Sequence, residues 1–239
     1  NWEQPINNWE KPLNNQEKSM NNYEKPIKKV NIGCGRTPTD GWLNMDNSPA
    51  IKLANSPLKY QIAKIFRLLN SSQIENIEWN KANSIQFADA TKTLPLKDGS
   101  VAFIYTSHML EHLSQDGARR FLKEALRALE DGGVLRIAVP DLKLAVEEYM
   151  ATEDADTFMR NILVQAPPIS TLKQKIQLFV SGYRHHQWMY DKNSLSKMLK
   201  ETGFKNVEVC TNGYTKDLNP NGLDLYERTE NSVYVEGVK

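Results

Sequence analysis

Short hydrophobic runs alternate with amphipathic stretches from residue 29 to the end of the chain. Runs typical of buried strands occupy 30–33, 42–45, 84–89, 100–107, 134–140, 206–210 and 232–238. Apolar residues recur at helical spacing over 58–69, 118–129 and 192–202. We expect the Asp-Gly-Gly sequence at 131–133 to cap the helix 118–129, because glycine readily takes the left-handed conformation there. The alternation predicts an α/β fold built on a parallel sheet.

Two irregularities refine this fold. No helical pattern separates the runs at 206–210 and 232–238, so we expect an antiparallel C-terminal strand pair at one edge of the sheet. The loop 36–41 is too short for an ordinary crossover helix, which usually needs a dozen residues or more. The sequence therefore predicts a doubly wound, mostly parallel, seven-stranded sheet in which the first crossover helix is shortened or absent.

The first 28 residues are four tandem heptapeptides: NWEQPIN, NWEKPLN, NQEKSMN and NYEKPIK. Their apolar residues have the spacing of a coiled-coil seam, but Pro5, Pro12 and Pro26 exclude a helix, since each would cost about 3 kcal/mol in a helix interior. Two interpretations stay open. The repeats 1–28 form either an arm that docks on a partner, on a second copy or on the same domain, or a weakly ordered tail without a role in the chemistry.

The remainder, 29–239, is interpreted as one domain. It is interrupted at 141–187 by a helical, irregular insertion. The chain is 40% hydrophobic and 25% charged, with a net charge of +1, so charge alone gives no reason to expect nucleic acid as a partner. Two distant cysteines suggest a reducing cytoplasm, and no apolar run reaches the roughly 18 residues of a membrane span.

Five motifs follow one another in a characteristic order. They are VNIGCG at 30–35, NMD at 44–46, FADA at 87–90, YTSHMLEHL at 105–113 and EDGGVLRIAVPDL at 130–142. In this order, and with the antiparallel final strands, the chain resembles the class I S-adenosylmethionine-dependent methyltransferases. Within that class it is most similar to small enzymes linked to glycan or small-molecule tailoring.

The resemblance implies a binding site for S-adenosylmethionine at the carboxyl ends of the strands, beside an acceptor pocket that the insertion 141–187 would cover. The glycine turn would approach the methionine portion, Asp46 would accept hydrogen bonds from both ribose hydroxyls, and Asp89 with Ala90 would recognise the adenine. The cofactor-binding residues carried over from the family are Asn31, Gly33, Cys34, Gly35, Met45, Asp46, Asp89, Ala90, Ser107 and Glu111. Asn31 and Ala102 depart from the family, which commonly has acids at both positions.

Three histidines are candidates for catalysis. His108 follows the fourth strand, and it either acts as a base or orienting group or packs beside the cofactor. His185 and His186 lie in the aromatic stretch 182–191, which forms either a wall of the acceptor pocket or a packed hinge. We interpret His112 as structural. No metal site is predicted, because the adjacent histidines have no further ligand at a recognisable spacing.

These features predict methyl transfer from S-adenosylmethionine to a small-molecule acceptor, such as a sugar or a nucleotide sugar, directed to oxygen or nitrogen. Since the sulfonium methyl is already activated, alignment would carry most of the catalysis. Two alternatives stay open. One is a protein or RNA methyltransferase that grips its substrate through the repeats. The other is a non-catalytic cofactor-binding or scaffold protein.

Overall fold

The structure is a computed structural model that describes residues 29–163, 185–217 and 219–239. The heptapeptide repeats 1–28 and the central part of the expected insertion lie outside the described residues. Within the described ranges, no helix has both the length and the apolar character that a membrane span requires.

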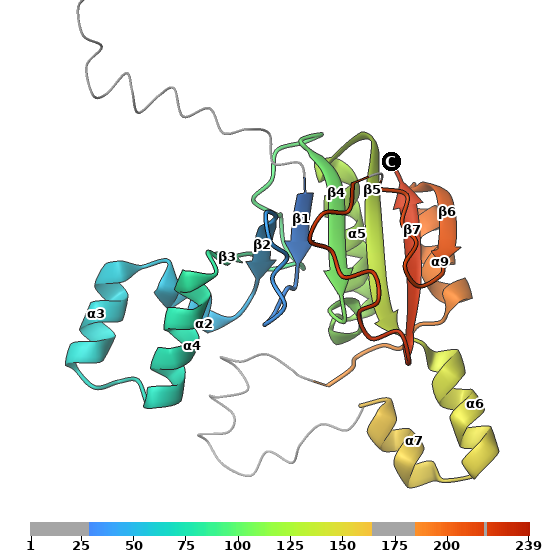
Figure 1. Cartoon of the computed structure of the whole chain (residues 1–239), viewed down its shortest axis with the longest axis horizontal. Helices are drawn as coiled ribbons and strands as arrows, with labels where there is room; N and C mark the ends of the chain where they lie inside the picture. Colours follow the sequence, from blue (N-terminus) through green and yellow to red (C-terminus); the bar gives the residue numbers. More distant parts are fainter. Residues whose placement is uncertain (1–28, 164–184, 218) are drawn as a thin grey trace, which may run out of the picture.

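A single seven-stranded sheet forms the centre of the molecule (Figure 1). The strand order is β3-β2-β1-β4-β5-β7-β6; β7 pairs antiparallel with both β5 and β6, and the other neighbouring pairs are parallel. The strands are β1 (Lys29–Ile32), β2 (Leu43–Asp46), β3 (Gln86–Phe87), β4 (Val101–Ser107), β5 (Leu129–Pro140), β6 (Lys205–Cys210) and β7 (Ser232–Val238). The predicted fold class and the antiparallel C-terminal pair are confirmed.

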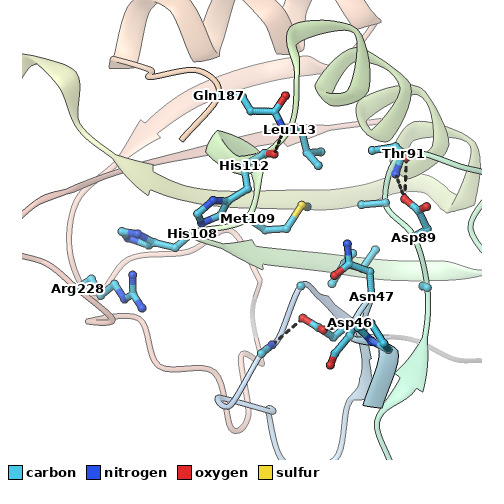
Figure 2. Close-up of a pocket in the computed structure, with 17 residues that line it drawn as sticks. Asp46, Asn47, Asp89, Thr91, His108, Met109, His112, Leu113, Gln187 and Arg228 are labelled. Atoms are coloured by element: carbon cyan, nitrogen blue, oxygen red, sulfur yellow. Dashed lines mark hydrogen bonds between the residues drawn. The ribbon is translucent and has the colours of Figure 1, made fainter. Parts of the chain in front are cut away.

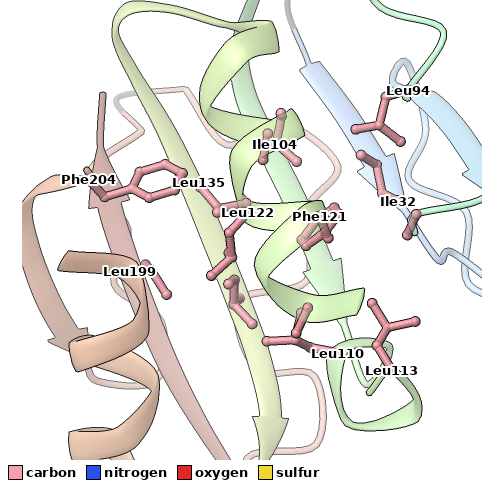
Figure 3. Packing of buried hydrophobic residues seen from close by; sticks show 14 of the residues in the cluster. Ile32, Leu94, Ile104, Leu110, Leu113, Phe121, Leu122, Leu135, Leu199 and Phe204 are labelled. Carbon is pink, nitrogen blue, oxygen red and sulfur yellow. The ribbon is translucent and has the colours of Figure 1, made fainter. Parts of the chain in front are cut away.

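Helices α5 (Gln115–Ala128) and α9 (Lys192–Thr202) cover one face of the sheet (Figures 1 and 3). Ser114 caps α5 by accepting a hydrogen bond from the Gly117 N–H, and Phe121 and Leu122 project from α5 into the main core. Ile104 of β4 meets them there, together with Leu199 and Phe204. Burial of these side chains, worth roughly 1.5–3 kcal/mol each, fixes the strands whose ends carry the site.

The opposite face of the sheet is covered by the linker 211–231 between β6 and β7 (Figure 1). Phe103 and Tyr105 point to this face, where they form a second cluster with Trp42 and Leu223 of the linker. The Trp42 indole N–H donates to the Asn221 carbonyl at 2.8 Å, which fastens the linker to the sheet. A segment without helix therefore protects the face that a crossover helix after β1 would otherwise cover.

The connection 33–42 from β1 to β2 contains no helix, as the short loop predicted. Two buried asparagines that pair in the sheet register hold it in place. The Asn31 amide donates to Thr39 Oγ1 at 3.0 Å, and Asn44 both accepts from the Thr39 N–H and donates to its carbonyl. Side-chain hydrogen bonds thus allow parallel neighbours to be joined by ten residues.

Several predicted boundaries were wrong. The helix before β5 ends at Ala128 because Leu129 is already extended, with φ −64° and ψ 140°, so 131–133 is no helix cap but part of β5. The run 84–89 contributes only two residues to a strand. The sequence also missed two helices, α2 (Pro49–Ala54) and α4 (Ser71–Ala82), which pack on each other beside α3 (Pro57–Ile65).

The expected insertion is helical where the structure describes it. Two helices, α6 (Leu142–Thr152) and α7 (Ala155–Asn161), follow β5 and contact each other. The chain is described again from residue 185. It is hydrogen-bonded there to Glu111, in the turn after β4, and then enters α9.

Candidate functional site

A cavity of about 740 Å³ lies at the carboxyl ends of β1, β2, β3 and β4 (Figure 2). This volume is in the usual range for small-molecule sites, about 300–1,000 Å³. Its position follows the general rule for open α/β sheets, in which ligands bind beyond the carboxyl ends of the strands. The lining residues are Ile32, Gly33, Gly35, Asp46, Asn47, Ser48, Pro49, Ala88, Asp89, Ala90, Thr91, His108, Met109, His112, Leu113, Gln187 and Arg228.

The glycine turn after β1 brings main chain to the cavity wall. Gly33 and Gly35 have φ of +75° and +51°, values that favour glycine. The N–H groups of Gly33 and Cys34 both donate to the Met45 carbonyl, which closes the turn against β2. A Cβ on Gly33 would lie 2.5 Å from Cγ of Met109, whereas nothing lies within 4 Å of a Cβ on Gly35.

Two carboxylates mark one end of the cavity. Asp46, the last residue of β2, accepts from the Gly35 N–H at 3.2 Å and from the Ser48 N–H at 2.8 Å, one on each oxygen. Each oxygen therefore keeps a lone pair for a ligand hydroxyl. Asp89, beyond β3, accepts two hydrogen bonds from Thr91 on a single oxygen, and these bonds together with nearby Lys92 lower its pKa despite burial. Both side chains therefore present carboxylate oxygens to the cavity as hydrogen-bond acceptors.

The other end of the cavity carries imidazole and guanidinium groups (Figure 2). His108 Nε2 lies 2.8 Å from Ser232 Oγ, and burial lowers the pKa of His108 to about 3, so its ring is neutral. Arg228 comes from the linker 211–231 and lies on the same side. Among the described residues, Arg228 has no carboxylate within salt-bridge distance. The cavity thus has one acidic and one basic end.

A compact polar cluster lies behind the basic end, around the short helix η1 (Leu110–His112). Glu111 is 1% exposed, and its Oε1 lies 3.4 Å from His108 Nδ1 and 3.9 Å from His186 Nε2. The rings of His112 and His186 meet edge to face at 5.1 Å between centroids. Burial raises the pKa of Glu111 to about 7 and lowers that of His186 to about 4.

The structure divides the residues predicted from sequence into two groups. Those that line the cavity are Gly33, Gly35, Asp46, Asp89, Ala90 and His108. Those that do not line it are Asn31, Cys34, Met45, Ser107, Glu111, His185 and His186. Asn31 braces the loop after β1, the Cys34 side chain packs against Ile51 and Ile85, and Met45 belongs to the main core.

Sequence reasoning missed part of the wall. Asn47, Ser48 and Thr91 directly follow the predicted carboxylates, so their positions could have been inferred from strand ends alone. Gln187 and Arg228 arrive from distant segments, and no local pattern marks them. His112, interpreted from sequence as structural, also lines the cavity.

Comparisons with known proteins identify the family of the chain. A family model described as "Methyltransferase domain" matches residues 23–209. No curated protein sequence is significantly similar to the chain. Among solved structures, a possible histamine N-methyltransferase from Thermotoga maritima shares 16% identity, with a TM-score of 0.46, over 89% of this chain and 82% of that one.

Two further structures are similar to a comparable degree. An S-adenosylmethionine-dependent methyltransferase from Methanosarcina mazei has 17% identity and a TM-score of 0.46, over 92% of this chain and 96% of that one. Phosphoethanolamine N-methyltransferase 2 from Haemonchus contortus, in complex with phosphomonomethylethanolamine and S-adenosylhomocysteine, has 12% identity and a TM-score of 0.44. The match covers 93% of this chain but only 51% of the Haemonchus protein.

Proposed function

The chain belongs to the methyltransferase-domain family, and we propose that it transfers a methyl group from S-adenosylmethionine to a small anionic acceptor, such as a sugar phosphate or a nucleotide sugar. The observation that carries this proposal is the polarity of the cavity, which has carboxylates at one end and Arg228 with His108 at the other. Family membership establishes the type of reaction, and the cavity supports the choice of acceptor.

The residues at the acidic end fit the cofactor. Asp46 offers two carboxylate oxygens at a strand end, as a ribose diol requires, and Asp89 offers an acceptor to an exocyclic amine. The open space at the Cβ position of Gly35 allows a ligand to approach its main chain. When bound, S-adenosylmethionine supplies a methyl group already activated by a sulfonium.

The basic end fits an acceptor that carries negative charge. The Arg228 guanidinium presents several N–H donors, and no described carboxylate lies within salt-bridge distance of it, so a phosphate or carboxylate of the acceptor is its natural partner. His108 is neutral and held by Ser232, which suits it to orient the acceptor rather than to carry charge. Holding the acceptor in line with the methyl group is the main catalytic task of these residues.

An Asp46→Asn variant tests the acidic end. Loss of the charge weakens hydrogen bonds to the ribose hydroxyls, each worth about 1.5–3 kcal/mol, so the affinity for S-adenosylmethionine should fall about tenfold or more. Asp131→Asn is the matched control, because Asp131 is exposed and lies outside the cavity. Equal affinities of Asp46→Asn and the wild type, measured by calorimetry, would contradict the assignment of Asp46.

An Arg228→Gln variant tests the basic end. Formation of S-adenosylhomocysteine would be measured with a panel of sugar phosphates, nucleotide sugars and small acids. For an acceptor found in this panel, the variant should raise the KM for the acceptor and leave the affinity for S-adenosylmethionine unchanged. A weaker cofactor affinity with an unchanged acceptor KM would instead place Arg228 on the cofactor carboxylate and refute the anionic-acceptor proposal.

A further inference from the structure

We propose that Glu111, His112 and His186 form a binding site for a divalent transition-metal ion, with Zn²⁺ as the ion that their chemistry favours. The three residues come from two segments, the short helix η1 and the stretch that enters α9. The sequence predicted no metal site, because the adjacent His185 and His186 have no further ligand at a recognisable spacing. The fold brings His186 next to Glu111 and His112, whereas His185 is not part of the group.

The ligand atoms are close enough for a small closing movement to bring them onto one ion. One ring nitrogen of each histidine and one carboxylate oxygen all lie within 4.8 Å of one another. His186 Nε2 is 3.9 Å from Glu111 Oε1. With metal–ligand distances near 2.0–2.1 Å, tetrahedral zinc ligands lie roughly 3.4 Å apart, so the separations need to shrink by about 0.5 to 1.4 Å.

In His112 and His186, Nδ1 lies beside a hydrogen-bond acceptor, and this leaves Nε2 of each ring as the lone-pair donor. His112 Nδ1 lies 3.2 Å from the His185 carbonyl, which only accepts, so this nitrogen carries the proton and Nε2 is free of it. His186 Nδ1 lies 3.2 Å from the Met189 sulfur, a weak acceptor, and a proton on Nδ1 leaves His186 Nε2, which lies 3.9 Å from Glu111 Oε1, as the lone-pair donor. Metal-binding histidines almost always have such an outer partner on the second nitrogen.

Glu111 supplies the strongest indication of a missing cation. Its side chain is buried, and neither carboxylate oxygen has a partner at hydrogen-bond distance among the described residues, although its own N–H and the Arg228 charge act on it from nearby. His108 provides none, because the Ser232 hydroxyl donates to Asn231 and so accepts the Nε2 proton of His108, leaving Nδ1 as an acceptor. Buried polar groups are rarely left unsatisfied, and those that are call for an unseen water or ion. Once Glu111 is ionised, its carboxylate faces the ring nitrogens of His108 and His186 at 3.4 and 3.9 Å without a proton between them, and a cation would satisfy all three groups.

Main-chain hydrogen bonds fix the two segments relative to each other. The N–H groups of Gln187 and Trp188 both donate to the Glu111 carbonyl, at 2.7 and 3.2 Å. The Gln187 side chain donates to the His112 carbonyl at 2.7 Å. The site is therefore largely formed before an ion binds, and a metal would tie the segment that enters α9 more firmly to η1.

The ligand set also places the ion next to the cavity. Two histidines and one glutamate are a set used by catalytic zinc sites, which keep the fourth position open. His112 is both a ligand and a lining residue of the cavity, so the ion would lie at the cavity wall, on the side of the acceptor. Zinc suits these ligands because it combines readily with imidazole nitrogen and carboxylate oxygen.

The experiment uses the full chain, purified without a histidine tag, stripped with a chelator and dialysed. Zn²⁺ binding is measured by competition with a chromophoric chelator, and Co²⁺ serves as a spectroscopic probe. We expect one equivalent of Zn²⁺ bound at micromolar concentration or below, and visible Co²⁺ absorption bands of a nitrogen- and oxygen-ligated site. Absence of stoichiometric binding of both ions to the folded wild type would overturn the proposal.

Three variants assign the ligands. Glu111→Gln and His186→Ala should each weaken Zn²⁺ binding by about 100-fold or more, with circular dichroism confirming that they are folded. His185→Ala should bind as the wild type does, because it keeps the main-chain carbonyl that holds His112. Unchanged affinity of a folded Glu111→Gln variant would show that Glu111 is protonated rather than metal-bound, and would refute the site. Cofactor calorimetry on the same samples reports on the methyltransferase proposal separately.

Discussion

Replacing Glu236 by glutamine should destabilise the protein strongly, although Glu236 lies outside the cavity. Arg136 and Glu236 stand directly opposite each other in the β5–β7 pair, are both 0% exposed, and are joined at 2.8 Å. The second oxygen of Glu236 accepts from the Lys216 N–H, and Arg136 donates to the Tyr214 carbonyl. The ion pair therefore fastens the linker 211–231, which carries the cavity residue Arg228, to the sheet.

The expected loss follows from the burial of both charges. Glutamine has the shape of glutamate but leaves the Arg136 guanidinium buried without a counter-charge. Removing one partner of a buried ion pair typically costs about 3–5 kcal/mol, a large part of the usual 5–15 kcal/mol free energy of unfolding. Because well-packed apolar residues often replace a buried pair without loss, the double variant Arg136→Met with Glu236→Leu should recover most of the stability.

Urea unfolding followed by circular dichroism measures this prediction. The midpoint should fall in Glu236→Gln with little change in the slope. Glu201→Gln is the matched control: Glu201 forms an exposed ion pair with Arg119 at 3.2 Å, and exposed pairs are worth about 0–1 kcal/mol. A loss below about 1 kcal/mol in Glu236→Gln, or a double variant less stable than either single one, would refute the reasoning.

Two further predictions concern the glycine turn and the thiols. Gly33→Ala should weaken cofactor binding and destabilise the fold more than Gly41→Ala does. Both glycines have φ of +75°, but of the two only a Cβ on Gly33 would collide with Met109. Equal effects of the two variants in calorimetry and urea unfolding would contradict this prediction. Burial raises the pKa of Cys34 to about 12 and that of Cys210 to about 11, so both thiols stay protonated at pH 8. A chromogenic disulfide reagent should therefore titrate two thiols in denaturant and none in the native protein. Rapid reaction of either thiol in the native protein would contradict this prediction.

The order of strands could be predicted because strong local patterns mark it. The buried runs that became β4, β5 and β7 are apolar over several residues, and the lack of a helix before β7 indicated its antiparallel direction. The missed helix α4 has only a weak apolar stripe, with Ile77 among its few buried residues, so periodicity alone could not reveal it. Its start instead depends on a capping box in which Asn70 and Gln73 bond each other's main chain.

The candidate site was predictable only where it follows strand ends. Asp46 and Asp89 lie at such ends, so topology alone brings them to the cavity. Arg228 and His186 reach their places through tertiary hydrogen bonds of the linker and of the stretch before α9. Tyr105, for example, donates to the Glu227 carboxylate across more than a hundred residues. No local periodicity encodes such contacts.

Calorimetry of the wild-type chain with S-adenosylmethionine and S-adenosylhomocysteine tests the central claim most directly. A polar cavity of about 740 Å³ at the strand ends of a methyltransferase-domain protein predicts saturable binding of both ligands with one site per chain, and mutual competition between them. A folded chain that binds neither ligand at millimolar concentration would contradict the account.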